Sequence, residues 1–523
     1  MRLRNRNKFD LSHDLICDME AGKLVPVLCQ EVVPGDDFKI TPYAFVRMAP
    51  MITAPFTRIS LWFHAFYVPN RIIYDDWDNL ITNGGPKANL TAVHPVVKAD
   101  ITKAAWQVGG LADYLGIPVK DRAGVNSSGV PDGSSVVNVN GMEFNALPFR
   151  AYNRIVNDWY TPEFVKDEIA IQTTGGLDTE TVLDLQNRSW KRDYLTSALP
   201  FTQLGEAASL PLSGNASVFA QYNGKLPSFK YLNGSNPPGT HALTSNGSSV
   251  FFSGIQNSSV YYDPADTLKV DLSKVTAASV LDLRMAELLQ AIAERRARHG
   301  NRTVEWVASE FGVRIPDSRL QRAEFLGGGR ADIMISEVLQ TSQTSDSSPQ
   351  ANIAGKGTGA AKVPTIRKAF TEHGWVIVMA SILPRQSYYQ GVPRHFLHRV
   401  WTDYLTPSLQ AVGEQPIYNE EVLAAPTNNP GGVFAFQPRY EPYRRALSRV
   451  AGHMRTSLDY FHTARQFSSP SVSFNWDFLK ANPTKRIFSA GDQADAPFWC
   501  QFGFDISAIR PLSKRGVPGV IFR

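Results

Sequence analysis

The fold of this chain is decided by residues 58–84, which read RISLWFHAFYVPNRIIYDDWDNLITNG. Side chains alternate across the first half of this stretch, as they do in a strand with two distinct faces. One face is apolar and carries Ile59, Leu61, Phe63, Ala65 and Tyr67. The other face is mixed, and it suits a second packed layer. Pro69 cannot donate to a strand ladder, so we expect the strand to end near Val68.

The second half of this stretch predicts a short helix over residues 75–82. Asp75, Asp76 and Asp78 fall in its first turn, where acidic groups complement the helix dipole, and Asn83-Gly84 supplies the stop. We expect both tryptophans to be largely buried. The residues expected to form the core and the turn of this scaffold are Trp62, Phe63, Phe66, Pro69, Asn70 and Trp77.

Residues 66–84, FYVPNRIIYDDWDNLITNG, resemble a signature of the major capsid proteins of the Microviridae, the small icosahedral single-stranded-DNA phages. The gokushovirus branch is the nearest match. Further similar blocks follow in order along the chain, among them LPFRAYNRIVNDWY (147–160), FGVRIPDSRLQRAEFLGGG (311–329) and FQPRYEPYRR (436–445). Residues 299–300 and 355–359 depart from the pattern, which puts local loop contacts in question and leaves the family in place.

The resemblance implies a mainly β fold: one eight-stranded antiparallel jelly roll, spanning residues 1–523, with long loop insertions that contain helices. It implies a structural protein, not an enzyme, that needs no cofactor. About sixty copies would form a closed icosahedral shell around circular single-stranded DNA. Implied partners are a small basic DNA-packaging protein, an internal scaffolding protein, a DNA pilot protein and a host cell-surface receptor. The protein would be assembled in the host bacterial cytoplasm and reside in the virion.

Composition is compatible with that fold. Apolar residues make up 43% and aromatic residues 11% of 523 residues, which is enough for a substantial core, and 38 Gly with 34 Pro favour short strands and turns. The net charge of +5 is small for this length, which argues against a soluble single-stranded-DNA-binding protein. A jelly-roll carbohydrate-binding protein or glycosidase stays open as an alternative, with Glu420 and Glu421 as its paired acids.

Two basic segments are candidates for contact with packaged DNA. Residues 1–10 form an arm that carries Arg2, Arg4, Arg6 and Lys8; a solvated, frayed terminus is the alternative. The second segment interleaves arginines with tyrosines, a pattern that suits a stacking groove for single-stranded DNA. Its candidate residues are Arg439, Tyr440, Tyr443, Arg444, Arg445, Arg449 and Arg455.

Residues 211–262 differ in composition from the rest, with two lysines, no acidic residue and several aromatic bursts. We expect them to form a protrusion at the three-fold axes, because a lone protrusion would expose too much apolar area. Gokushovirus capsids carry such spikes, and loop tips commonly contact receptors. The candidate spike and receptor residues are Phe229, Tyr231, Asn233, Asn236 and Thr240.

Three further segments carry predictions. Residues 280–298 predict an amphipathic helix whose apolar face includes Leu281, Met285 and Leu288. Residues 394–405 predict a helix with Phe396, Val400 and Tyr404 on one side. Residues 340–361 predict a flexible Ser/Thr/Gly-rich loop, whose GKGTG sequence at 355–359 lacks the Ser/Thr that a P-loop requires.

No catalytic or metal-binding motif stands out. The sequence has no GxSxG, HExxH or thiol-protease signature, and His395 with His398 has no third ligand nearby. The aspartates at 75, 76 and 78 do not follow the spacing of a calcium loop. Three unpaired cysteines are expected to be buried thiols in a reducing compartment. No apolar run reaches the length of a membrane span, so no membrane insertion is expected.

Overall fold

The computed structural model describes residues 6–83, 92–120, 137–206, 279–339, 353–469, 471–489 and 496–514, together with short strands between residues 217 and 271. The chain divides into two compact units. The first unit comprises Met1–Thr202 and Ala297–Arg523, and the second comprises Gln203–Arg296.

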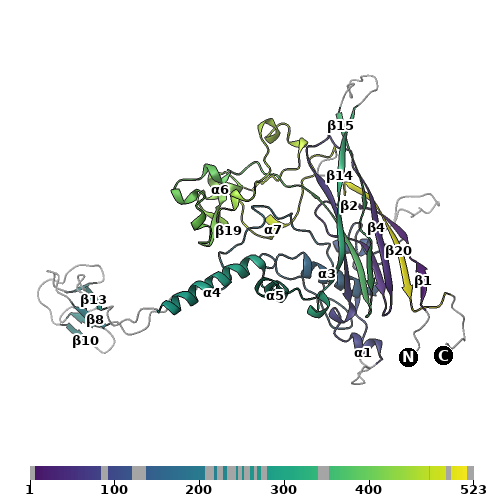
Figure 1. The fold of residues 1–523 in the computed structure, drawn as a ribbon, viewed down its shortest axis with the longest axis horizontal. Helices are drawn as coiled ribbons and strands as arrows, with labels where there is room; N and C mark the ends of the chain where they lie inside the picture. The colour runs from purple at the N-terminus through teal and green to yellow at the C-terminus, as the bar shows by residue number, and fades with distance from the viewer. Residues whose placement is uncertain are drawn as a thin grey trace. The chain divides into compact units, whose positions relative to one another are not determined.

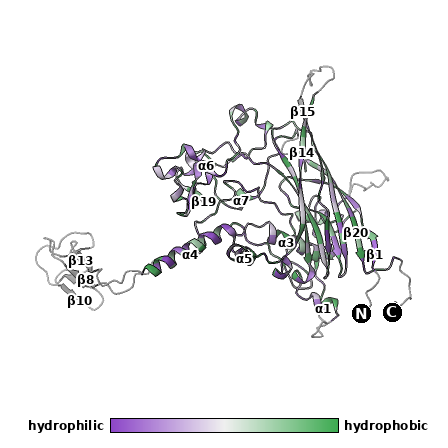
Figure 2. Cartoon of the chain, viewed as in Figure 1, coloured by the Kyte–Doolittle hydropathy of each residue, from purple (hydrophilic) through white to green (hydrophobic). Residues whose placement is uncertain are grey.

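An antiparallel sheet dominates the first unit and curls into a half-barrel (Figure 1). Its strands run in the order β1-β20-β4-β15-β14-β5-β17-β3, with β2 also beside β20 and β16 beside β4. Hydrophobic and hydrophilic residues are interleaved along these strands (Figure 2). The strand bounds are β1 (Asn7–Asp10), β2 (His13–Met19), β3 (Val25–Val32), β4 (Asp37–Met48), β5 (Ile59–Pro69), β14 (Glu324–Leu339), β15 (Ile353–Lys362), β16 (Ile366–Ala369), β17 (Gly374–Pro384) and β20 (Phe498–Arg510).

Strand β5 lies between β14 and β17 and contributes to a core on each face of the sheet. The alternation seen in the sequence is confirmed, because the predicted apolar set, Ile59, Leu61, Phe63, Ala65 and Tyr67, belongs to one buried cluster. On the opposite face, Phe66 and Val68 belong to a second cluster that includes residues of α3 (Leu147–Trp159). A strand with packed layers on both sides cannot move without disturbing both cores.

Smaller elements of the first unit surround the sheet. The helices are α1 (Trp77–Ile81), α2 (Leu111–Tyr114), α3, α5 (Thr303–Phe311), α6 (Asn419–Val422) and α7 (Trp476–Leu479). Two small antiparallel pairs join β6 (Val96–Lys98) with β7 (Glu143–Asn145) and β18 (Glu414–Tyr418) with β19 (Val433–Pro438).

The second unit contains three two-stranded pairs and most of helix α4 (Val280–His299). The pairs are β8 (Ser217–Ala220) with β13 (Leu268–Asp271), β9 (Ser228–Tyr231) with β12 (Val260–Asp263), and β10 (Leu243–Ser245) with β11 (Val250–Phe252). The predicted helix at 280–298 is therefore confirmed.

The predicted fold class is confirmed: a mainly antiparallel β protein with helices in its loops, consistent with a jelly-roll capsid fold. The count of eight strands is not confirmed, because the sheet contains ten strands in the described part of the chain. The alternation of residues 498–509 and the apolar run of residues 375–383 are typical of strands, and these residues fall in β20 and β17. The 3–4 spacing of apolar residues in 148–160 is typical of a helix, and most of these residues fall in α3.

Residues 353–361 are not a loop, because they belong to β15 and pair with β14 and β4. The glycines that suggested a loop are required by close packing. A Cβ at Gly357 would overlap the sulfur of Met48, and a Cβ at Gly355 would overlap the carbonyl oxygen of Thr53. Tertiary packing therefore overrides the low strand propensity of glycine.

Residues 394–405 do not form the predicted helix. Two 3-10 turns, Arg394–Phe396 and Trp401–Asp403, are separated by residues that include Val400 with φ −125° and ψ 159°. An extended residue at this position interrupts a helix, so the spacing of Phe396 and Tyr404 does not define a helical face.

Both predicted core tryptophans are only partly buried, contrary to expectation. Trp62 and Trp77 keep intermediate exposure, whereas Phe63, Phe66, Pro69 and Asn70 are buried. Trp62 lies on the mixed face of β5, opposite the main core, and its side chain lines a cavity.

Candidate nucleic-acid interface

A cavity of about 480 Å³ lies in the first unit, where one end of β5 and one end of β17 meet the middle of β14. Arg58 directly precedes β5, Arg330 lies in β14 opposite Trp62, and Arg385 directly follows β17. The backbone N–H of Arg385 donates to the carbonyl of Arg58 at 2.8 Å, which holds these two strand ends together. The sheet register therefore brings to one place three cations that are far apart in the sequence.

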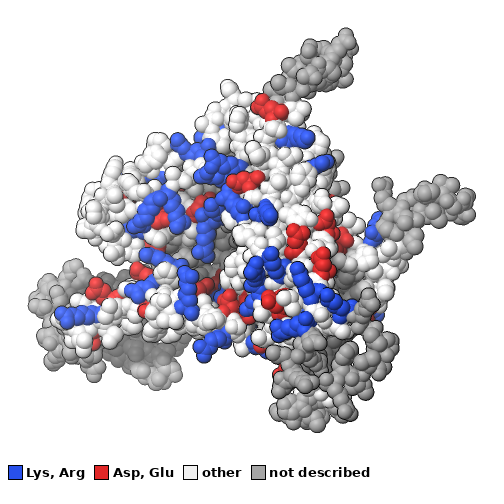
Figure 3. Space-filling view, turned by 45° about the vertical axis from the view of Figure 1, so that its right-hand side comes forward, with Lys and Arg blue, Asp and Glu red and all other residues white. Residues whose placement is uncertain are grey.

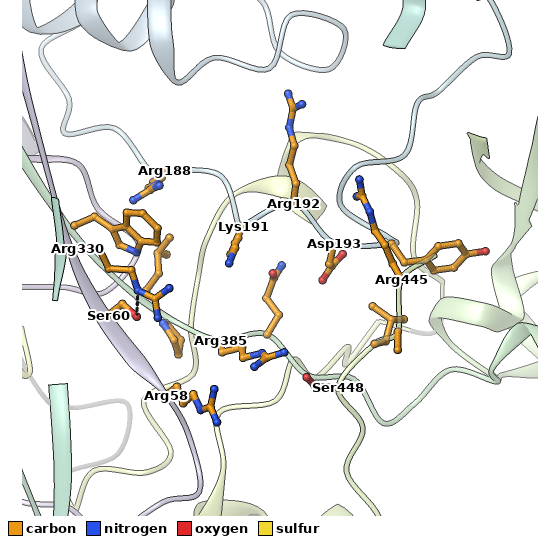
Figure 4. A pocket seen from close by; sticks show the side chains of 17 residues that line it. Arg58, Ser60, Arg188, Lys191, Arg192, Asp193, Arg330, Arg385, Arg445 and Ser448 are labelled. Carbon is orange, nitrogen blue, oxygen red and sulfur yellow. Dashed lines mark hydrogen bonds between the residues drawn. The ribbon is translucent and has the colours of Figure 1, made fainter. Parts of the chain in front are cut away.

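Two further segments complete the wall of the cavity: residues 188–194 and residues 445–448. Figure 4 shows the side chains around the cavity. Among the lining residues, Asp193 is the single acid, against seven cations: Arg58, Arg188, Lys191, Arg192, Arg330, Arg385 and Arg445.

The indole of Trp62 holds two of these cations in place. The guanidinium carbon of Arg188 lies 4.9 Å from the ring centroid and that of Arg330 lies 5.3 Å from it, within the range of cation–π contacts. Arg188 also donates to the Ser381 hydroxyl at 2.9 Å, and burial lowers the pKa of Arg188. Arg330 donates to the Ser60 hydroxyl at 3.1 Å. The tryptophan thus helps to orient the two arginines at the cavity rim, and Arg330 is also held by an ion pair with Asp332 at 2.7 Å.

Four of the cavity cations are exposed and make no ion pair within the described residues: Arg58, Lys191, Arg192 and Arg385. Asp193 does not offset them fully, since its carboxylate accepts hydrogen bonds from the hydroxyls of Tyr388 at 2.8 Å and Thr196 at 2.9 Å. Lys and Arg side chains also gather visibly on one face of the molecule (Figure 3). An excess of cations in a concave site attracts polyanions.

A second cavity of about 410 Å³ is lined in part by residues of the 445–449 segment, which also borders the first cavity. Arg445 lines both cavities, and the second also contains Arg449, Arg455, His398 and Tyr443. Three of the arginines predicted to face DNA therefore line one or the other cavity.

Most residues of the predicted stacking segment, including Arg445 at the cavities, also make contacts within the chain. Arg444 and Arg445 pair with the buried Glu441 at 3.1 and 2.9 Å, and Arg439 donates to the carbonyl of Thr402 at 3.3 Å. Tyr440 is 3% exposed, with φ +63°, so its ring has no free face for a nucleobase. The stacking groove expected there is thus reduced to Tyr443, which is 53% exposed.

The basic arm does not line either cavity in the described residues. Arg2 and Arg4 lie outside them, Arg6 is exposed, and Lys8 is exposed in β1. The spike candidates are also beyond direct description: Phe229 and Tyr231 belong to β9, but their side chains, and all of Asn233, Asn236 and Thr240, lie outside the described residues.

The carboxylates proposed for a glycosidase do not converge in a cleft. Glu421 is 5% exposed, pairs with Arg394 at 2.7 Å and accepts a hydrogen bond from the Tyr194 hydroxyl. Glu420 accepts from the backbone N–H of Gly431. Both acids therefore hold loops together.

Across the described ranges, no group of three His, Cys, Asp or Glu residues is placed to hold a metal ion. Their helices include none with the length and apolarity needed to cross a membrane. Cys17, Cys29 and Cys500 are free thiols, and burial raises the pKa of Cys17 to about 12.

Sequence reasoning missed most of the first cavity. Its cations come from five separate segments, and no local pattern links them. The one available signal was the run RSWKR at 188–192, which places Arg188, Lys191 and Arg192 within five residues.

Comparison with known proteins gives one consistent family. Residues 2–520 match the family model described as "Capsid protein (F protein)". The chain is 32% identical over 543 residues to "Capsid protein VP1" of Bdellovibrio phage phiMH2K, covering 99% of this chain and 96% of that protein. It is 29% identical to "Capsid protein VP1" of Chlamydia phage 1 (98% and 96% covered) and 28% identical to that of Spiroplasma virus 4 (98% and 95% covered).

Proposed function

Because the chain belongs to the capsid protein (F protein) family, as its resemblance to Microviridae capsid proteins predicted, we propose that it assembles into a closed icosahedral shell around circular single-stranded DNA. The observation that carries this proposal is a family match over residues 2–520. Membership indicates a structural protein of the virion that associates with itself. One chain per symmetry unit requires about sixty copies.

Sedimentation of the purified protein tests the shell. About sixty copies of a 57.9 kDa chain amount to about 3.5 MDa before any DNA is added. We expect a fast-sedimenting particle of that size that protects single-stranded DNA from nuclease. A slow monomer under all assembly conditions would contradict the proposal.

We propose that the cationic cavity holds phosphates of the packaged DNA. Single-stranded DNA carries a charge at every nucleotide, and each phosphate that meets a Lys or Arg releases condensed counterions. Arg58, Lys191, Arg192 and Arg385 supply four such groups that form no ion pair with an acid of the described chain. Trp62 supports two further cations of the cavity, because its ring contacts the guanidiniums of Arg188 and Arg330.

A charge-matched pair of variants tests the cavity. Arg58, Lys191, Arg192 and Arg385 are replaced by Gln in one variant, and Lys39, Lys356, Lys362 and Arg367, exposed on β4, β15 and β16, are replaced by Gln in the other. Both lose four charges. We expect the cavity variant to retain less DNA than the control variant at low salt and to show a weaker dependence of retention on salt, since each lost phosphate contact reduces the salt slope by about 0.7. Equal DNA retention by the two variants would contradict a specific role for the cavity.

We propose that residues 211–262 form a spike at the three-fold axes that contacts the host receptor. Helix α4 supports an association of copies nearby, since Leu281, Met285, Leu288 and Ile292 follow the 4-3-4 spacing of a coiled-coil seam. The first three side chains are 70, 53 and 61% exposed in the single chain. Excision of residues 214–259 with a short Gly/Ser bridge should leave shell assembly intact and abolish adsorption to the host. Normal adsorption, or failure to assemble, would count against the spike.

The remaining partners follow from the family resemblance. We propose that assembly takes place in the host bacterial cytoplasm. It would involve three further proteins: a small basic packaging protein, an internal scaffolding protein and a DNA pilot protein. Mass spectrometry of immature and mature particles tests this composition. Particles that form and package DNA from this chain alone would contradict a requirement for such partners.

A further inference from the structure

Residues 394–412 expose an unusual number of large apolar side chains. None of these residues is buried, and the segment consists of short 3-10 turns joined by irregular chain. We name as the aromatic patch the six large apolar side chains that are 50–70% exposed: Phe396, Val400, Trp401, Tyr404, Leu405 and Val412.

The aromatic patch is held in a defined conformation although it has little apolar packing. The carboxylate of Asp403 accepts the backbone N–H groups of Arg399 and Val400 at 2.8 and 3.0 Å. The carbonyl of Thr402 accepts the Tyr440 hydroxyl at 3.1 Å, and Arg394 donates to the carbonyl of Pro416 at 2.8 Å. The backbone of the patch is therefore already ordered in the single chain, so binding of a partner costs little further conformational entropy.

The exposed aromatic area is comparable to the largest apolar patch of a typical soluble monomer, and such patches are often functional. An aromatic side chain offers roughly 150–250 Å², so the three aromatic residues of the patch leave on the order of 400 Å² uncovered. Soluble monomers rarely expose contiguous apolar patches above a few hundred Å². That area is about half of what one partner contributes to a standard interface of about 800 Å² per side.

We propose that the aromatic patch is an interface between copies of this chain, packed against a different surface of the neighbouring copy. The inference rests on the proposed shell, in which each copy contacts its neighbours, and it adds the surface that makes one of those contacts. A second copy is the occupant that family membership itself supplies.

The charge of the patch decides between two kinds of contact. Arg399 is exposed within it and makes no ion pair in the described part of the chain. If the patch met itself across a two-fold axis, two copies of Arg399 would approach each other, and juxtaposed like charges are unfavourable. A heterologous contact, in which Arg399 faces a carboxylate of another surface, avoids this and closes rings around five-fold or three-fold axes.

Assembly of the full-length protein tests the interface. We expect the double substitution Phe396→Ser with Trp401→Ser to raise the subunit concentration needed for half-assembly by about tenfold or more, the scale on which truncation of central interface aromatics acts. Arg399→Glu should weaken assembly in the same direction. The conservative Trp401→Phe variant keeps most of the apolar area and should assemble at close to the wild-type concentration.

Thermal melting of dissociated subunits separates loss of an interface from loss of folding. The patch lacks buried residues, so we expect the double variant to melt with the wild-type subunit. Should that variant unfold, Arg399→Glu decides alone. Wild-type assembly by the double variant, or by Arg399→Glu, would overturn the proposal. Failure of the wild-type chain to form shells would instead count against the proposed function.

Discussion

Strand β5 and the aromatic patch are both rich in large apolar side chains, yet they use them in opposite ways. In β5, Phe63 and Phe66 are each 1% exposed, whereas Phe396 and Trp401 in the patch are 69 and 70% exposed. The strand has a neighbour on each side and a packed layer on each face, and the patch has no strand partner. The aromatic side chains of β5 are buried within the chain, and we propose that those of the patch are buried between chains.

The largest expected effect comes from truncating the buried strand. Phe63 packs edge-on against Phe502 at 5.6 Å, so Phe63→Ala leaves a cavity between two strands of the sheet. We expect a loss of ~3–5 kcal/mol in the free energy of unfolding of the dissociated subunit. Denaturant titration measures it. A loss as small as that of an exposed residue would erase the contrast between β5 and the patch.

The next largest effect is expected from acid, which should destabilise the folded subunit through His64 in β5. Burial, together with the charge of Arg188, lowers the pKa of His64 from 6.5 to about 4, and its Nδ1 lies 2.7 Å from the Tyr160 hydroxyl. The unfolded chain therefore binds a proton near pH 6.5 that the folded chain refuses until about pH 4. The contribution of neutral His64 to the free energy of unfolding is fully present above pH 6.5. It falls by up to about 3 kcal/mol between pH 6.5 and pH 4.

His64→Gln isolates this contribution, because glutamine can keep a hydrogen bond and cannot titrate. The difference in unfolding free energy between wild type and variant should change between pH 6.5 and pH 4 and stay constant above 6.5. A pH-independent difference would show that the pKa of His64 is the same in the folded and the unfolded chain, and would contradict this account.

A smaller effect is expected at Trp62, whose exposure lies between that of the buried aromatic side chains of β5 and that of the aromatic patch. Its ring is partly exposed and supports Arg188 and Arg330, so Trp62→Ala should cost the subunit about 1–2 kcal/mol, below the range for a fully buried tryptophan. DNA retention in shells should fall as well, because the two arginines lose their support. A cost equal to that of Phe63→Ala would place Trp62 in the core after all.

Regular alternation and helical spacing made much of the fold predictable. The two faces of β5, the helix at 147–159 and strands β17 and β20 each have a pattern that local geometry demands. β15 escaped prediction because its glycines are selected by contacts with Met48 and Thr53 that are remote in sequence.

The candidate site was less predictable for a related reason. The cavity is assembled by sheet register from Arg58, Arg330 and Arg385, and register is a property of paired strands, not of one segment. Tyr440 illustrates the converse: a basic, tyrosine-containing run suggested a stacking surface, but the ring is buried against its own chain. The sequence predicted which kinds of side chain are present, but it did not predict which of them are exposed to a ligand.

The most direct test of burial between copies is hydroxyl-radical footprinting of shells and dissociated subunits, read out by mass spectrometry at Phe63, Phe396 and Trp401. The account predicts that Phe63 is protected in both states, because it is buried within the chain. Phe396 and Trp401 should be labelled readily in subunits and protected in shells. Equal labelling of Trp401 in subunits and in intact shells would contradict the account, since the aromatic patch would then face solvent in the assembled particle.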